Sequence, residues 1–219
     1  MRATLLTIFS VIILVPCSIV LFGAFKSDIK IISEPLALPD SWSFDNFKHL
    51  FSSGRLLLPA RNSLLVSSAS VFITILLATM AAFAIARSIT ISGKILFLLF
   101  SIGLAIPGQV NIIPIYLLFL KLHLTNSLLG LILVNIALTL PISIFIITAF
   151  IKDLPKEMFE VASIDGASPF RTYRSIALPL ARPAIGATSI FLFVITWNDL
   201  LYPLMLITEN SKKTLPLMM

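Results

Sequence analysis

Charge is what this sequence has least of. Only 12% of its 219 residues are Asp, Glu, Lys or Arg, whereas 58% are hydrophobic. A soluble globular domain carries about a quarter charged residues. The composition therefore excludes a soluble domain with an ordinary surface, and it predicts a protein that crosses a membrane several times.

Reactive side chains are also scarce. Cys17 is the single cysteine, which excludes an intrachain disulfide and a cysteine-based metal cluster. The two histidines, His49 and His123, are isolated in predicted loops. The sequence has no GxxxxGK[ST] phosphate loop, no HExxH and no GxSxG. We therefore assign no catalytic, cofactor-binding or metal-binding residue, and we do not expect the chain to be an enzyme.

Long apolar segments fill most of the chain. We predict an all-α, polytopic helix bundle that forms a single transmembrane domain over residues 1–219. A cleaved signal peptide is the alternative for the first segment, and its length favours an uncleaved span. The loop at 26–61 contains Trp42, Phe44 and Phe47, which are typical of a segment at the membrane surface. The five predicted spans are 4–25, 62–86, 95–120 (interrupted near Pro107 and Pro114), 127–150 and 183–206.

One polar segment separates the last two spans. Pro155 is well placed in the first turn of a helix, and Gly166 ends that helix because glycine adopts positive φ without penalty. Ser168 followed by Pro169 predicts the cap and first residue of a second helix that ends near Leu178 and Pro179. The segment is therefore a helix–Gly–helix unit, too polar for lipid and too short for a domain.

The spacing within this unit resembles that of the permease subunits of ABC importers. The matching residues, in the family's Glu-Ala-Ala…Gly…Ile-x-Leu-Pro pattern, are Glu160, Ala162, Gly166, Ile176, Leu178 and Pro179; Val161 stands where the family has Ala. Weaker matches, in the order of the carbohydrate (maltose-transporter) group, are 25–27, 43–47, 61–63 and 197–199. The resemblance implies that residues 152–182 form a cytoplasmic coupling loop, whose helix–Gly–helix part (155–178) docks on a separate ATPase.

Polar residues inside the spans are the candidates for a substrate pathway. Asn135, Thr139 and Ser143 are four residues apart and share one helix face, where they either bond another helix or line a route for solute. An aspartate at mid-membrane costs about 2.5–3.5 kcal/mol, so Asp199 is either functional or already at headgroup depth. The remaining candidates are Gln109 and Asn111, for which a simple proline kink is the alternative, and Asn198.

The resemblance implies the function and the partners. We expect a permease subunit of an ATP-driven importer for a small sugar or oligosaccharide, in the cell membrane of a prokaryote. Its expected partners are ABC ATPase subunits that bind ATP and Mg²⁺, a second permease, an extracytoplasmic solute-binding protein and the bilayer, with no nucleic acid. A permease for a polyamine, a peptide or a phosphate ester, and a self-contained secondary transporter, are the alternatives.

The sequence says less about the C-terminal end of the chain and about its orientation in the membrane. Related permeases carry one further span, so we expect a sixth, C-terminal span to be missing. With the amino terminus inside, eight Lys and Arg residues fall on each side of the membrane, and the positive-inside rule does not decide the orientation. The resemblance places the amino terminus and the coupling loop in the cytoplasm and the 26–61 loop outside.

Overall fold

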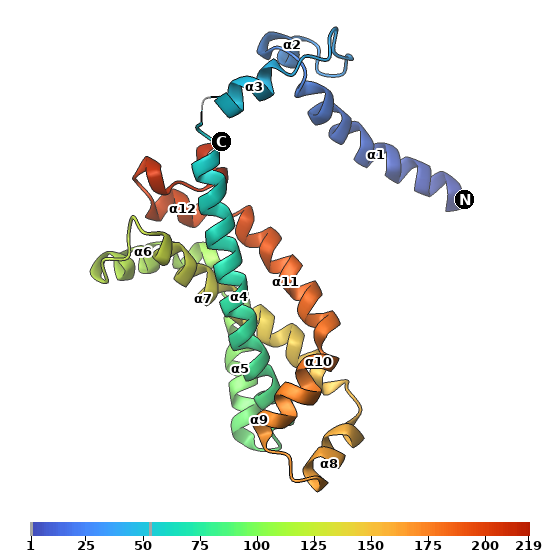
Figure 1. Ribbon diagram of the computed structural model, residues 1–219, viewed down its shortest axis with the longest axis vertical. Helices are drawn as coiled ribbons and strands as arrows, with labels where there is room; N and C mark the ends of the chain where they lie inside the picture. The colour runs from blue at the N-terminus through green and yellow to red at the C-terminus, as the bar shows by residue number, and fades with distance from the viewer. Residues whose placement is uncertain (1, 53) are drawn as a thin grey trace. The chain divides into compact units, whose positions relative to one another are not determined.

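The computed structural model describes residues 2–52 and 54–219, and within those residues it contains helices and no strand. The chain divides into two compact units, Met1–Leu57 and Leu58–Met219. The prediction of a single domain is not tested by this division, and each unit is described by itself (Figure 1).

The first unit consists of three helices, α1 (Arg2–Gly23), α2 (Asp28–Ser33) and α3 (Asp45–Ser52). None of the 18-residue apolar window of α1 is buried inside the protein. The loop after α1 folds on itself, because Lys26 is buried and its Nζ donates to the carbonyls of Glu34 and Pro35, at 2.8 and 3.3 Å. Phe25 packs edge-on against Trp42 and Phe44. The aromatic residues predicted for a membrane-surface segment therefore form one cluster.

The second unit is built on two long helices, α4 (Leu57–Arg87) and α7 (Leu128–Lys152). Small residues on α4 allow close packing, and Ala78 and Ala82 are fully buried in a cluster with Ile144 and Ile147 of α7. Helices α5 (Ile91–Ala105) and α11 (Arg182–Trp197) pack against α7. The predicted second and fourth spans are confirmed.

The predicted third span is sharply bent. Helix α5 ends before Pro107, because the residue before a proline is restricted to extended conformations, and Ile106 is extended. A short 3₁₀ turn, η1 (Gly108–Asn111), leads to α6 (Ile112–Lys121), and the two together (Gly108–Lys121) are bent by 88° from α5. Pro114 does not interrupt the helix as predicted, because it lies in the first turn of α6, where a missing N–H costs nothing.

The predicted fifth span is not one continuous helix. Helix α11 ends at Trp197 and α12 (Leu201–Leu206) begins after a break of three residues. Asn198 Nδ2 donates to Val194 O at 2.7 Å, and Asp199 Oδ1 accepts from the backbone N–H groups of Leu201 and Tyr202, at 3.1 and 3.5 Å. These side chains compete with the helical ladder and start a new helix. A 3₁₀ turn, η3 (Asn210–Lys212), and α13 (Leu215–Met218) follow.

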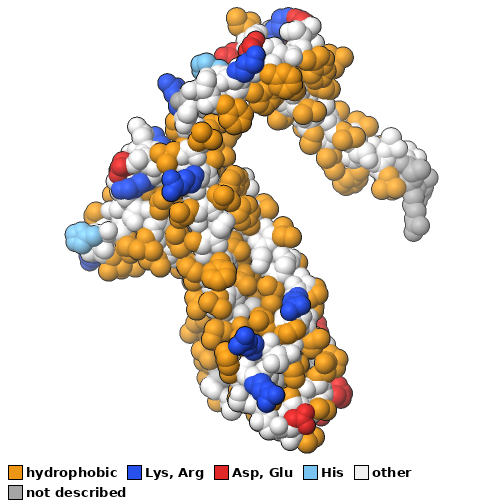
Figure 2. Space-filling model, in the orientation of Figure 1, with side chains coloured by type: hydrophobic (Ala, Val, Ile, Leu, Met, Phe, Trp, Pro, Cys, Tyr) orange, Lys and Arg blue, Asp and Glu red, His pale blue; other side chains and the backbone are white. Residues whose placement is uncertain are grey.

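Among the described residues, three helices are long and apolar enough to cross a membrane, and up to five spans result if each of two sharply bent helix pairs is one span. In Figure 2, hydrophobic side chains dominate the middle of the second unit, and charged side chains gather toward its two ends. This distribution is the one expected of a bundle that spans a hydrocarbon layer.

Candidate functional site

The glycine turn predicted at Gly166 is present. Helix α8 (Lys156–Ile164) follows Pro155 and ends in a Schellman motif. The N–H of Gly166 bonds to Ser163 O at 3.1 Å, and the N–H of Ala167 bonds to Ala162 O at 2.9 Å. Gly166 has φ +69°, and an added Cβ would meet no atom within 4 Å. Glycine is therefore favoured here by the backbone conformation and not by space.

The second helix of the unit begins as predicted and contains an unpredicted π segment. Ser168 Oγ accepts from the N–H of Arg171 at the start of α9 (Pro169–Thr172). The chain continues through a π segment, η2 (Tyr173–Ala177), in which the N–H of Leu178 bonds to Tyr173 O five residues back. Helix α10 (Leu178–Leu180) follows. Pro179 has no N–H for the carbonyl four residues earlier, and a π turn accommodates such a break in the α-helical ladder.

Two aromatic side chains attach the unit to α4. Phe159 and Tyr173 are 4% and 8% exposed, and the ring of Phe83 lies 6.5 and 5.6 Å from theirs. Tyr173 OH and Thr79 Oγ1 share a hydrogen bond of 2.9 Å, and the Arg87 guanidinium lies 4.3 Å from the Phe159 ring centre. Thr79, Phe83 and Arg87 are four residues apart along α4 and so share one face. This repeat was readable in the sequence, but our sequence analysis missed it.

The other side of the unit is largely uncovered by the described part of the chain. Glu160 is exposed and makes no side-chain hydrogen bond or ion pair with the described residues. Val161, Ile164 and Phe170 are 56%, 84% and 62% exposed. A hollow of about 550 Å³ lies between α8 and the second helix, and its walls include Ala162 and Ile176. Of the other predicted coupling residues, Leu178 and Pro179 lie half-buried in α10.

The structure brings together three of the candidate pathway residues. Asn135, Thr139 and Ser143 are all buried on one face of α7, as predicted. Each side chain donates to the carbonyl four residues earlier, at 2.7–2.9 Å. Thr139 Oγ1 also shares a hydrogen bond of 3.2 Å with Thr74 Oγ1 of α4. These contacts favour the interhelical interpretation for Thr139, and a pathway role for the three stays a prediction.

The remaining candidates lie at the two breaks of the helices. Gln109 and Asn111 are in the 3₁₀ turn between α5 and α6, and Gln109 is exposed. Asn198 is exposed and Asp199 is half-buried between α11 and α12. The second carboxylate oxygen of Asp199 is buried and has no hydrogen-bond partner among the described residues. Their role in a pathway also stays a prediction.

Replacing Asp199 by alanine should destabilise the protein, whereas Asp199→Asn should not. Alanine removes the oxygen that accepts from Leu201 and Tyr202, at a cost of about 1 kcal/mol. Asparagine keeps that acceptor. The measurement is the thermal midpoint of the detergent-solubilised protein. Equal midpoints for the two variants would show that Asp199 does not cap α12.

Metal ligands do not cluster in the part of the chain that the structure describes. Within residues 2–52 and 54–219, no three His, Cys, Asp or Glu side chains are placed to hold a metal ion.

The similarity to known proteins extends over nearly the whole chain. Residues 74–217 match the family described as "Binding-protein-dependent transport system inner membrane component". A diacetylchitobiose uptake system permease protein of Streptomyces coelicolor is 34% identical over 95% of this chain and 69% of its own length. A multiple sugar-binding transport system permease protein of Streptococcus mutans is 33% identical over 99% of this chain and 79% of its own length.

A solved structure shows the same fold. It is that of a bacterial ABC transporter involved in the import of the acidic polysaccharide alginate, with a TM-score of 0.80 and 18% identity. The match covers 99% of this chain and 75% of the other.

Proposed function

Because the chain belongs to the family of binding-protein-dependent transport system inner membrane components, we propose that it imports a small sugar or oligosaccharide as the permease subunit of an ATP-driven importer. The relatives that support a sugar cargo are named for diacetylchitobiose, for multiple sugars and for trehalose and maltose. The candidate cargo is therefore a mono- or oligosaccharide delivered by a binding protein.

The coupling loop is the observation that carries this proposal. One side of it is fixed to α4 through Phe159 and Tyr173, and the other presents Glu160 and exposed apolar side chains. Such a loop can transmit motion, because one face is packed on the bundle and the opposite face is free to bind another protein. We assign the role of that protein to an ATPase subunit. Closure of two ATPase subunits on ATP moves the loop as a lever and switches the bundle between two states.

The residues of this chain indicate which tasks its proposed partners perform. This chain supplies no nucleotide-binding group, so ATP and Mg²⁺ are held by the ATPase partners. A second permease completes the pathway, and an extracytoplasmic solute-binding protein delivers the cargo. The coupling loop and the amino terminus face the cytoplasm of a prokaryotic cell, and the end of the bundle that carries α12 faces outside.

The proposal is tested by co-purification of the tagged full-length chain from its native host in detergent. We expect an ABC ATPase, a second permease and ATPase activity to co-purify. After reconstitution with the solute-binding protein, vesicles should take up at least one of four radiolabelled sugars, namely diacetylchitobiose, maltose, trehalose and glucose.

Three results would contradict parts of this proposal. Uptake of spermidine, a dipeptide or glycerol phosphate in place of the sugars would keep the importer and change its cargo. Uptake by the chain alone, without an ATPase, would favour a secondary transporter. A complex that lacks ATPase activity would overturn the lever mechanism.

A further inference from the structure

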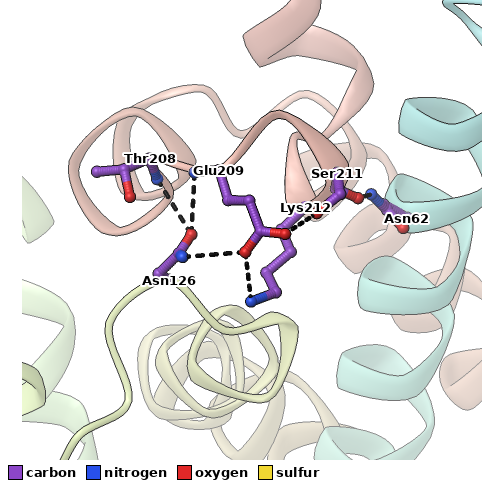
Figure 3. Close-up of polar contacts among 6 residues, drawn as sticks. All are labelled: Asn62, Asn126, Thr208, Glu209, Ser211 and Lys212. Carbon is purple, nitrogen blue, oxygen red and sulfur yellow. Dashed lines mark hydrogen bonds and ion pairs between the residues drawn. The ribbon is translucent and has the colours of Figure 1, made fainter.

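The segment that follows α12 is held by side chains from two distant parts of the second unit. Figure 3 shows Asn126, in the turn between α6 and α7, pointing into the loop formed by residues 208–212. Asn126 Oδ1 accepts from the N–H groups of Thr208 and Glu209, at 3.3 and 3.0 Å. Its Nδ2 donates to Glu209 Oε2 at 3.2 Å, and its backbone N–H donates to Leu206 O. Both the oxygen and the nitrogen of the Asn126 side-chain amide therefore bond to this loop.

The carboxylate of Glu209 organises the loop internally. Lys212 Nζ lies 2.8 Å from Glu209 Oε2, and Ser211 Oγ donates to Oε1. These donors, Lys212 above all, hold the pKa of Glu209 below its usual range. The carboxylate therefore stays charged at neutral pH and keeps accepting from Asn126.

Helix α4 holds the other side of the same segment (Figure 3). Asn62 is 5% exposed, and its Nδ2 donates to the carbonyls of Ser211 and Lys213, both at 2.9 Å. One residue further along α4, Ser63 Oγ accepts from the N–H of Leu215 at 2.8 Å. Residues 206–215 thus connect the first part of α4 with the α6–α7 turn.

The apolar side of the segment is buried as well. Leu206 and Ile207 belong to a cluster that includes Val66 of α4, Phe119 of α6 and Leu131 of α7. The segment is therefore not a loose loop, because it is bonded on its polar side and packed on its apolar side.

We propose that Asn62 and Asn126 are positioning residues that clasp the 206–215 segment, so that this segment, the first part of α4 and the α6–α7 turn move as one rigid body during transport. The inference rests on the proposed function, since it needs a bundle that changes state. The α6–α7 turn lies beyond the helix break at 106–107, the 206–215 segment lies beyond the break at 198–200, and Asn62 belongs to the unbroken helix α4. Changes of angle concentrate in these breaks, and the clasp keeps the elements past them in a fixed arrangement.

The turn offers a matched pair of variants. Asn126 and His123 are the two non-glycine residues with positive φ in the described chain, at 52° and 55°. Glycine accepts both conformations, so Asn126→Gly removes only the amide side chain. His123→Gly makes the same backbone change in the same turn, and the His123 side chain takes no part in the clasp.

The experiment compares both variants with wild type in the reconstituted complex, using the four-sugar panel. Asn126→Gly should lower sugar uptake per ATP hydrolysed roughly fivefold, because it removes several hydrogen bonds without touching the ATPase. It should also open the loop to trypsin at Lys212 and Lys213. His123→Gly should match wild type in both respects. Unchanged uptake per ATP in Asn126→Gly would overturn the inference.

A cross-link tests whether the clasp stays closed. In a Cys17→Ser background, the pair Asn62→Cys and Ser211→Cys removes the Asn62 bonds and should lower uptake per ATP. A short thiol cross-linker then replaces them, and we expect uptake to recover, since the joined parts move together. A block of uptake by the cross-linker would show that the parts separate in each cycle and would overturn the inference. If the proposed function itself is wrong, wild type shows no ATP-driven sugar uptake, whereas failure of this inference leaves wild-type uptake intact.

Discussion

Replacing Gly166 by valine should lower ATP-driven uptake by roughly tenfold or more while the chain still inserts and assembles. A residue other than glycine in the left-handed region costs about 1–2 kcal/mol, and a β-branched one costs more. The added Cβ meets nothing within 4 Å, so the strain falls on the turn between α8 and α9. Relief of that strain changes the angle between the two helices and moves Glu160 away from the position in which we propose that it contacts the ATPase.

Gly166→Asn is the matched control, because asparagine is among the residues that best tolerate positive φ. It should keep most of the uptake. The measurement is sugar uptake by vesicles that hold equal amounts of complex. Full uptake by Gly166→Val would contradict the lever mechanism, and equal loss in both variants would assign the effect to the side chain and not to the turn.

Replacing Phe83 by alanine should separate ATP hydrolysis from transport. Its ring packs near those of both Phe159 and Tyr173. Truncation of a buried Phe costs about 3–5 kcal/mol, and less at a half-buried site such as this. The loop would keep the exposed face through which we propose that it docks on the ATPase. We therefore expect ATPase activity to persist while uptake falls by roughly an order of magnitude or more.

Two further variants locate the effect of Phe83→Ala. Phe83→Leu keeps an apolar side chain in the same place and should retain much of the uptake. Met80→Ala changes a side chain of α4 that is 47% exposed and should leave uptake unchanged. Loss of ATPase activity and uptake together in Phe83→Ala would mean that Phe83 supports assembly and not the transfer of motion.

The sequence was a good guide wherever a single local rule decides the structure. Pro155, Gly166 and Ser168 each have a strong conformational preference, and the helix–Gly–helix unit follows the prediction. The common face of Asn135, Thr139 and Ser143 follows from the helical repeat alone. The resemblance to the family added the expectation that this unit docks on an ATPase. Composition alone does not lead to that expectation.

Hydropathy was a poor guide where side chains compete with the backbone. The break at 198–200 lies in an apolar run, and it depends on hydrogen bonds from Asn198 and Asp199 that hydropathy does not register. The contacts of Asn62 and Asn126 were not predicted, although 61–63 was a weaker match to the family, because their partners are more than 80 residues away in the chain. Such contacts depend on tertiary packing, which a local pattern does not contain.

The π segment at 173–177 lets the second helix of the coupling loop hold one extra residue while the helices before and after it stay in phase. An α-helix turns by about 100° per residue, and the i→i+5 bond of Leu178 to Tyr173 takes up one residue more than an α-turn needs. Removal of one residue between these two would restore an α-helical register and preserve the helix. It would leave the Phe159–Tyr173 attachment nearly in phase with α11, because the wide turn already takes up the extra residue. The same deletion within α11, where no wide turn takes it up, would rotate the attachment by about 100° relative to the rest of the bundle and change the direction in which motion reaches it.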